Sequence, residues 1–310
     1  MGIIEVQDLK KSFRGRSVLN GISFSVEQGE VFGFLGPNGA GKTTTMRLLL
    51  GLLRPDSGAA RVLGQSLSDH DLLRHKVGVL LENSGLYERL TCYENLDYMA
   101  RLYRVPDPAS RIAELLFFVG LSGSGDQVVG TLSTGMKRKL GLARAILHDP
   151  EILFFDEPSS GLDPEAQHMV RELILRLSHK ESITVFLNSH NLDEVQRVCS
   201  RVAILHQGQI QTLDTIEHLT SGTGTTTVRI TLADPGQADM AASLARSLER
   251  VIEVVSLDRD RVRVTLEGGS VSQLLGRLVQ EGIGIEEAVK VSRTLEEIYL
   301  DVMHQSGAVI

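Results

Sequence analysis

The stretch Gly36-Pro37-Asn38-Gly39-Ala40-Gly41-Lys42-Thr43 matches the spacing GxxxxGK[ST] at every fixed position. Glycines let the backbone curl until successive N–H groups point at the oxygens of one anion. Lys42 adds a positive charge for the β- and γ-phosphates, and the Thr43 hydroxyl is suited to ligate Mg²⁺. We therefore predict that residues 36–43, together with the following Thr44, bind the phosphates of a nucleotide.

The neighbouring sequence provides the context that this loop requires. Val31–Leu35 is wholly apolar, which is typical of a strand buried on both faces. A helical pattern runs from Gly41 to Leu53 and ends at residues 54–58, which contain proline and glycine. A strand, a loop and a helix in this order favour a phosphate loop over a chance match, because the positive end of the helix then faces the anion.

A second apolar strand, Ile152–Phe155, ends in two carboxylates, Asp156 and Glu157. Alone, such a pair more often marks a solvated loop. Beside a phosphate loop, Asp156 is placed to hold Mg²⁺ through water. Glu157 is placed to polarise the water that attacks the γ-phosphate. The phosphate loop after the first strand and the two carboxylates after the second together predict ATP hydrolysis.

Between these elements lies Leu132-Ser133-Thr134-Gly135-Met136. Here the chain resembles the ATP-binding-cassette (ABC) family, whose signature is LSGGQ. Ser133 and Gly135 match that signature, whereas Thr134 and Met136 depart from it. A hydroxyl and backbone N–H groups at a helix start can bind a γ-phosphate, although a serine that only caps its own helix would give the same sequence pattern. The resemblance implies that Ser133 and Gly135 bind ATP held by a second subunit.

The resemblance covers about residues 3–215 and implies roles for further residues. Ser160-Gly161-Leu162-Asp163 looks like the family's D-loop, so Asp163 is expected at the nucleotide across a dimer. His190, after the apolar strand Ile183–Leu187, looks like the switch histidine that contacts the γ-phosphate. We therefore expect Glu157 and His190 to form the catalytic pair.

Two other positions carry weaker expectations from the same resemblance. Phe13 stands where the family places an aromatic ring that stacks on adenine, although a core phenylalanine is the competing interpretation. Glu82 stands where the family usually has the glutamine that links Mg²⁺ to the membrane-facing subdomain. A carboxylate can ligate Mg²⁺, but an ionised one cannot donate a hydrogen bond. Thr43, Glu82 and Asp156 are thus the expected metal ligands.

Strands and helices alternate through the first two thirds of the chain, which predicts an α/β fold with parallel strands and helices on both faces. We expect a P-loop NTPase of the ABC type over residues 1–219, with a helical subdomain at about 86–147. Small polar residues at 220–227 indicate a linker. Residues 228–310 show the order βαββαβ, which favours a small α+β ferredoxin-like domain with an accessory or regulatory role.

Composition limits the partners and the location of the chain. The net charge is −7, and residues 221–310 hold nine basic and thirteen acidic residues, so we expect no nucleic-acid partner. Cys92 and Cys199 match no metal motif, and two reduced thiols in a cytoplasmic protein is the simplest interpretation. Neither a signal peptide nor a membrane-length apolar run is evident. We expect a cytoplasmic chain that is peripheral on the inner face of the cell membrane.

One phosphate loop and one signature per chain imply, by the resemblance, a homodimer with two shared ATP sites. Residues 86–91 and 93–96 resemble the groove that receives a helix of a separate multi-span membrane subunit, although ordinary helical packing explains them as well. The leading hypothesis is therefore the ATPase subunit of an exporter. An importer ATPase with a ligand-sensing tail and a soluble non-transport ABC ATPase remain the alternatives.

Overall fold

The computed structural model describes residues 2–66, 75–81, 85–221, 225–268, 271–291 and 293–305. The chain divides into two compact units, Met1–Asp214 with Val302–Ile310, and Thr215–Asp301. This division falls five residues before the predicted boundary at 219/220. Helix α8 (Ile216–Ser221) and strand β11 (from Thr225) take up most of the predicted linker 220–227, of which residues 222–224 lie outside the described residues.

A six-stranded sheet forms the centre of the first unit, in the order β10-β9-β3-β8-β7-β6. Strands β9, β3, β8, β7 and β6 pair in parallel, so their carboxyl ends meet at one edge. β3, β7 and β8 are buried along their whole length, as the continuous apolar runs predicted. The bounds are β3 Val31–Leu35, β6 Val77–Leu80, β7 Ile152–Asp156, β8 Thr184–Asn188, β9 Arg201–His206 and β10 Gln209–Thr215.

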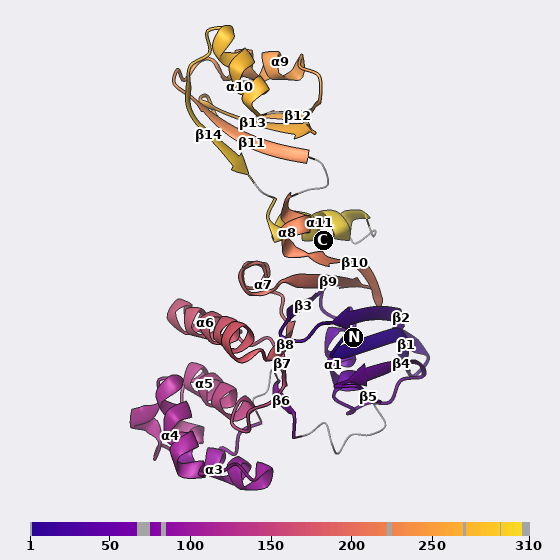
Figure 1. Ribbon diagram of the computed structural model, residues 1–310, viewed down its shortest axis with the longest axis vertical. Helices are drawn as coiled ribbons and strands as arrows, with labels where there is room; N and C mark the ends of the chain where they lie inside the picture. The colour runs from indigo at the N-terminus through magenta and orange to yellow at the C-terminus, as the bar shows by residue number, and fades with distance from the viewer. Residues whose placement is uncertain are drawn as a thin grey trace. The chain divides into compact units, whose positions relative to one another are not determined.

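A second, four-stranded sheet in the order β2-β1-β4-β5 covers one face of the central sheet, with helix α1 beside it (Figure 1). One apolar core joins the two sheets, and Phe24 of β2 stacks on Phe32 of β3 with ring centroids 5.5 Å apart. Aromatic contacts of this kind fix the strand that carries the phosphate loop. The bounds are β1 Ile4–Phe13, β2 Arg16–Val26, α1 Lys42–Leu49, β4 Ser57–Val62 and β5 Gln65–Ser66.

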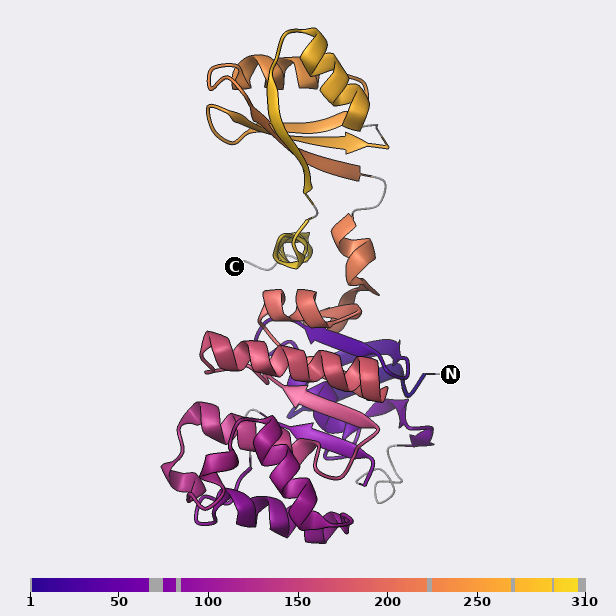
Figure 2. The same cartoon turned by 60° about the vertical axis from the view of Figure 1, so that its left-hand side comes forward.

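The opposite face of the central sheet is covered by α6 (Pro164–Glu181) and α7 (Leu192–Val198), as Figure 2 shows. Asp163 caps α6, because its carboxylate accepts a hydrogen bond from the N–H of Ala166 at 2.8 Å. Helices therefore cover this face as predicted. The other face is covered by the β2-β1-β4-β5 sheet as well as by α1, because the strands of residues 4–66 pair in a sheet of their own.

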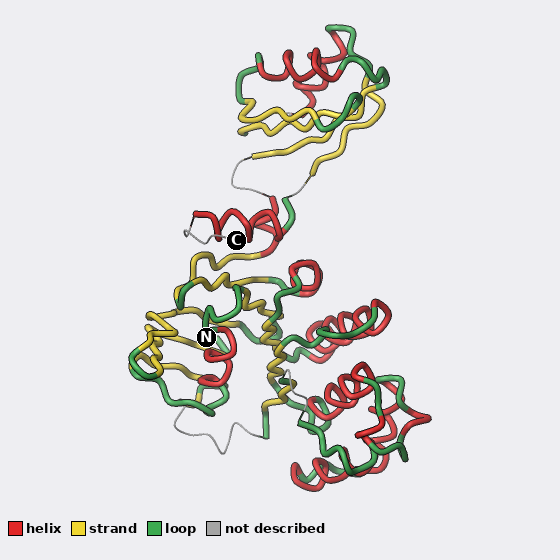
Figure 3. Tube along the Cα trace, turned by 180° about the vertical axis from the view of Figure 1, so that it is seen from behind, coloured by secondary structure: helices red, strands yellow, loops and turns green. Residues whose placement is uncertain are grey.

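The predicted helical subdomain is present, and Figure 3 shows it as helices and loops beside the strands of the sheets. Its first helix begins with a capping box, in which Thr91 and Glu94 satisfy each other's backbone N–H groups. The elements are α3 Cys92–Tyr103, α4 Pro108–Phe118, η1 Ser122–Ser124, η2 Val129–Thr131 and α5 Thr134–Ala145. None of the described helices has the length and apolar character needed to cross a membrane.

The second unit contains an antiparallel sheet in the order β12-β13-β11-β14. Alternating residues of its strands, such as Val228, Ile230 and Val264, pack with α9 and α10 in a separate core. The element order is βαββαβ, the order expected from the sequence. The bounds are β11 Thr225–Leu232, α9 Ala238–Arg246, β12 Val251–Ser256, β13 Arg261–Glu267, α10 Val271–Gln280 and β14 Ile285–Val291, followed by α11 Leu295–Gln305.

Candidate active site

The loop after β3 has a backbone that only glycine fits at two positions. Gly36 has φ 154°, and a Cβ there would lie 2.2 Å from the carbonyl oxygen of Leu205. Gly41 has φ 114°, and a Cβ there would lie 2.6 Å from Leu19 Cδ2. Both glycines thus allow the loop to pass close to its neighbours, as the sequence motif requires.

The other side of the loop is open. Gly39 has φ 81°, and nothing lies within 4 Å of where its Cβ would be. A cavity of about 860 Å³ lies over the loop, which leaves room for a nucleotide. The predicted phosphate-binding residues 37–44 all line it, whereas Gly36 does not. The other lining residues were not predicted; they are Arg16, Ser17, Val18, Asn20, His206, Gln207 and Gly208.

Lys42 is buried, and its ammonium group lies within the loop. Its Nζ donates to the carbonyl oxygens of Gly36 at 2.7 Å and Pro37 at 3.2 Å. Burial lowers the pKa of Lys42 from its ordinary value, and the nearby carboxylates of Glu157 and Asp156 act in the opposite direction. The structure thus brings the cation of β3's loop together with the carboxylates at the end of β7.

Asp156 is the last residue of β7 and is only 5% exposed. It lies in register with Asn188, the last residue of β8, whose Nδ2 donates a hydrogen bond to Asp156 Oδ1. Asn188 Oδ1 is buried and has no hydrogen-bond partner in the described part of the chain. We did not predict Asn188, although a polar residue after the apolar run 183–187 was the available signal.

Glu157 and His190, the predicted catalytic pair, meet at this edge. The two side chains touch, with His190 Nδ1 2.7 Å from Glu157 Oε2. The backbone N–H of His190 also faces the same oxygen at 3.3 Å, and the N–H of Glu157 donates to Asn188 O at 2.8 Å. Glu157 has φ 54°, an uncommon conformation for a residue with a side chain. This contact orients a carboxylate with a histidine, which suits a general base.

Arg138 of α5 holds the backbone on which both carboxylates stand, and the sequence analysis missed it. Arg138 is 5% exposed, and its guanidinium donates to the carbonyl oxygens of Leu81 at 2.7 Å, Asp156 at 2.6 Å and Pro158 at 3.0 Å. It donates to Glu157 O as well. Arginine suits this task because its planar fork presents five donors. Arg138 stands between Lys137 and Lys139, and nothing in this basic run indicated that Arg138 would be the buried member.

The signature residues lie at the start of α5, apart from the cavity. Ser133 is exposed and caps the helix by accepting from the N–H of Met136 at 3.2 Å. A Cβ at Gly135 would lie 3.6 Å from Leu162, in the predicted D-loop. Among the described residues, neither Ser133, Gly135 nor Asp163 lines the cavity over the phosphate loop. Their predicted contacts with ATP remain predictions.

Phe13 ends β1 with 43% of its surface exposed, so the competing interpretation as a core residue is wrong. Its partner in the strand register, Arg16, lines the cavity. Lys11 lies over the ring face of Phe13, with its Nζ 5.4 Å from the ring centroid.

Glu82, the third predicted metal ligand, lies outside the described residues.

The oxygen groups of Thr43 and Asp156 fit Mg²⁺, which prefers hydroxyl, carboxylate and water ligands and keeps several waters. Within the described ranges, the His, Cys, Asp and Glu side chains form no group of three or more suited to a metal ion. Two protein ligands near substrate phosphates are the usual arrangement for this ion. When bound, Mg²⁺ would stabilise negative charge on the phosphoryl oxygens.

Comparison with known proteins agrees with this geometry. The sequence model of the ABC transporter family matches residues 19–160. The uncharacterized ABC transporter ATP-binding protein YhcH of Bacillus subtilis is 32% identical over 97% of this chain and 95% of its own length. The bacitracin transport ATP-binding protein BcrA of Bacillus licheniformis is 40% identical over 70% of this chain and 71% of its own. The linearmycin resistance protein LnrL of B. subtilis is 34% identical over 81% of both chains.

Solved structures give the same result for the fold. The protein cbiO1 of Clostridium perfringens, part of the ABC transporter complex cbiONQ, superposes with a TM-score of 0.63 at 25% identity over 70% of this chain and 89% of its own. The dimeric, post-hydrolysis state of the ATP-binding cassette MJ0796 with ADP and Pi gives 0.64 at 21% identity over 69% and 98%. With its phosphate loop and paired carboxylates at one edge of a P-loop NTPase sheet, the chain belongs to the ABC transporter ATP-binding proteins, a family of ATPases.

Proposed function

We propose that this chain hydrolyses Mg-ATP as half of a homodimer and that this cycle drives a separate multi-span membrane subunit of an exporter. The contact between Glu157 and His190, beside the carboxylate of Asp156 and the ammonium of Lys42, supports the proposal most directly. A cation, a general base and an orienting histidine are the protein groups that phosphoryl transfer to water needs.

The predicted site residues have the following roles in the proposed reaction. The backbone N–H groups of residues 38, 39 and 41–43 and the Lys42 ammonium hold the β- and γ-phosphates. Glu157 orients a water molecule behind the γ-phosphate and accepts its proton, while His190 holds the carboxylate and contacts the same phosphate. Thr43 and Asp156 hold Mg²⁺. Phe13 stacks on the adenine, because an exposed ring beside the cavity offers a face to a base.

The dimer is proposed because three residues expected to contact ATP, Ser133, Gly135 and Asp163, do not line the cavity. Ser133 and Gly135 are accessible at the start of α5 and do not line it. A second copy would bring its own signature to this cavity, with Asp163 nearby, and a two-fold arrangement would complete both sites. ATP would favour the closed dimer because only that state uses all its phosphate contacts.

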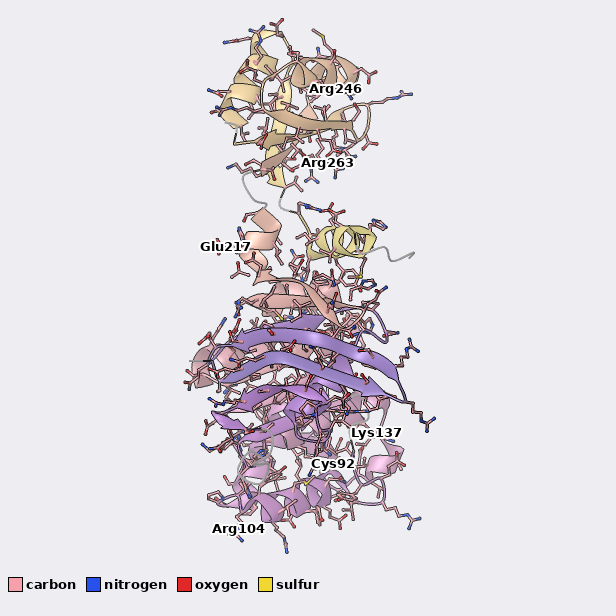
Figure 4. The ribbon with its side chains drawn as sticks, turned by 90° about the vertical axis from the view of Figure 1, so that its right-hand side faces the viewer. Cys92, Arg104, Lys137, Glu217, Arg246 and Arg263 are labelled. Atoms are coloured by element: carbon pink, nitrogen blue, oxygen red, sulfur yellow. The ribbon has the colours of Figure 1, made fainter. Side chains whose placement is uncertain are left out.

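The proposed membrane partner binds the helical subdomain. Tyr87, Tyr93, Tyr98 and Leu102 are all exposed there, and the rings of Tyr87 and Tyr98 lie 5.2 Å apart. Exposed aromatic groups of this kind are enriched at protein interfaces. Figure 4 shows Arg104 on the outer part of the same subdomain. The Nod factor export ATP-binding protein I of Burkholderia orbicola is named for export and BcrA for bacitracin transport, which also favours an exporter. We place the chain on the inner face of the membrane because its proposed partner spans that membrane.

We further propose that the second unit is ferredoxin-like and stabilises the dimer or regulates it. Its βαββαβ order and its strand order β12-β13-β11-β14 support the fold assignment. The fold itself does not fix the role.

The test is a capture experiment with the trapped enzyme. Tagged Glu157→Gln protein is expressed in the source cell, supplied with ATP, gently extracted from membranes and analysed by mass spectrometry. A multi-span membrane protein in stoichiometric amount is expected. Glu157→Gln with Ser133→Arg is the control, because it carries the same defect but cannot form the trapped dimer. Recovery of ribosomal proteins or DNA factors without a membrane chain would refute the exporter and favour a non-transport ATPase.

A further inference from the structure

Glu194, in the first turn of α7, is a carboxylate inside the protein. It is 1% exposed and belongs to none of the motifs singled out above. Its Oε1 accepts a hydrogen bond from Ser159 Oγ, and its Oε2 accepts one from Ser189 Oγ at 3.0 Å. Both serines are buried as well. One carboxylate therefore joins two hydroxyl groups away from solvent.

The two serines belong to the loops that carry the proposed catalytic pair. Ser159 follows Glu157 by two residues after β7, and Ser189 directly precedes His190 after β8. Ser189 Oγ also accepts from the N–H of Asn191 at 3.1 Å. Glu194 is thus linked to both sides of the contact between Glu157 and His190.

A buried carboxylate is costly unless hydrogen bonds compensate its lost hydration. Burial raises the pKa of Glu194, whereas the two serine hydroxyls act in the opposite direction. Its backbone N–H is satisfied by Asn191 Oδ1 at 3.1 Å, so the helix start would be capped without the carboxylate. An apolar residue would fill this position at lower cost, so packing does not explain the glutamate.

We infer that Glu194 is a positioning residue for ATP hydrolysis, which holds the loops after β7 and β8 so that Glu157 and His190 stay in contact. This inference rests on the proposed roles of Glu157 and His190. Small misplacements of reacting groups reduce rates strongly, because the bound geometry no longer resembles the reactive one. Glu194 touches neither the nucleotide cavity nor the reacting atoms, so its effect is expected in kcat.

The first test compares Glu194→Ala with Glu194→Gln in the full chain. Turnover is divided by the number of ATP sites titrated with a fluorescent ATP analogue, so that unfolded protein does not count. Glu194→Ala is expected to lower kcat on the order of tenfold or more, while KM for ATP stays within about twofold. Glu194→Gln is expected to recover most of kcat, because its amide can accept from one serine and donate to the other.

Ser159→Ala and Ser189→Ala give a second route that leaves the carboxylate in place. Each is expected to lower kcat by itself, and each is expected to add little in the Glu194→Ala background, because residues that act as a unit are not additive. Additive effects, or a raised KM with unchanged kcat, would overturn the inference. Should Glu194→Ala not fold, the two serine variants decide the question.

Glu30→Gln is the matched control. Glu30 is also a buried carboxylate, 9% exposed, but it precedes β3 at the opposite edge of the sheet and pairs with Arg201 at 3.3 Å. We expect it to lower the melting temperature and leave kcat per titrated site unchanged. Glu157→Gln separates the two hypotheses. If Glu157→Gln is inactive but Glu194→Ala turns over normally, only the inference fails; if Glu157→Gln retains hydrolysis, the proposed function fails first.

Discussion

Two regions of the first unit differ in how their predicted functional residues are supported. At the carboxyl edge of the central sheet, Asp156, Glu157 and Lys42 are largely buried and each is bonded within the same chain. At the start of α5, Ser133 is exposed, and its hydroxyl caps its own helix. The first region is held by hydrogen bonds within its own chain, and the second is an exposed surface.

This difference is what a shared site predicts. Groups that must be held at fixed distances for chemistry are positioned by buried hydrogen bonds, which are costly to break. Groups that meet a ligand only when a second subunit closes have to remain accessible until then. The following changes test the two regions separately.

Glu157→Gln should give the largest effect. It removes the proposed base but keeps the shape of the side chain, so kcat is expected to fall by about 10²–10⁴-fold. Binding of ATP should be retained, which equilibrium titration of the purified protein measures. Hydrolysis at an undiminished rate would remove Glu157 from the mechanism.

Ser133→Arg should come next. A long cation at the exposed helix start would block the γ-phosphate of a second subunit, and hydrolysis is expected to fall on the order of 10²-fold. Sedimentation in ATP should show monomers, while monomers still bind ATP, since the cavity of each chain is intact. An unaltered ATP-induced dimer would show that the surface at α5 is not half of a site.

Arg138→Met should have a smaller effect on the rate, about tenfold in kcat, because it releases the backbone carbonyls of Asp156 and Glu157 without removing a reacting group. It should also lower the free energy of unfolding by about 2–3 kcal/mol, since hydrogen bonds to a buried cation are lost. Lys139→Met is the control on the same helix. Equal effects of both changes on kcat would contradict the role of Arg138.

Phe13→Ala should have the smallest effect. Loss of the proposed stacking face is worth about 0.5–1.5 kcal/mol, so the Kd for ATP is expected to rise by roughly 2–12-fold. Phe13→Tyr should bind as the wild type does, because it keeps the ring. If Phe13→Ala binds ATP normally, adenine stacks elsewhere and the exposed ring has another use.

Much of the candidate site could be predicted because it follows local rules. The glycines of residues 36–43 and the carboxylates Asp156 and Glu157 directly follow apolar runs, and His190 follows the run 183–187 by three positions. Parallel strands bring those positions to one edge. Arg138 and Glu194 could not be predicted in the same way. Each is one charged residue among several on a helix, and only the packing of that helix decides which of them is buried.

The sequence by itself thus determined the α/β class, the phosphate-loop motif between a strand and a helix, and the βαββαβ order of the second unit, because these depend on spacing and hydrophobic period. The hydrolytic roles of Glu157 and His190 remain predictions. Only the tertiary structure decided that an antiparallel sheet shares the core, that Phe13 is exposed, and that Arg138 and Glu194 are buried and hydrogen-bonded to the segments that follow β7 and, for Glu194, β8. The physical reason is that burial and hydrogen bonding between residues 20 to 60 positions apart depend on how whole elements pack, which no local pattern encodes.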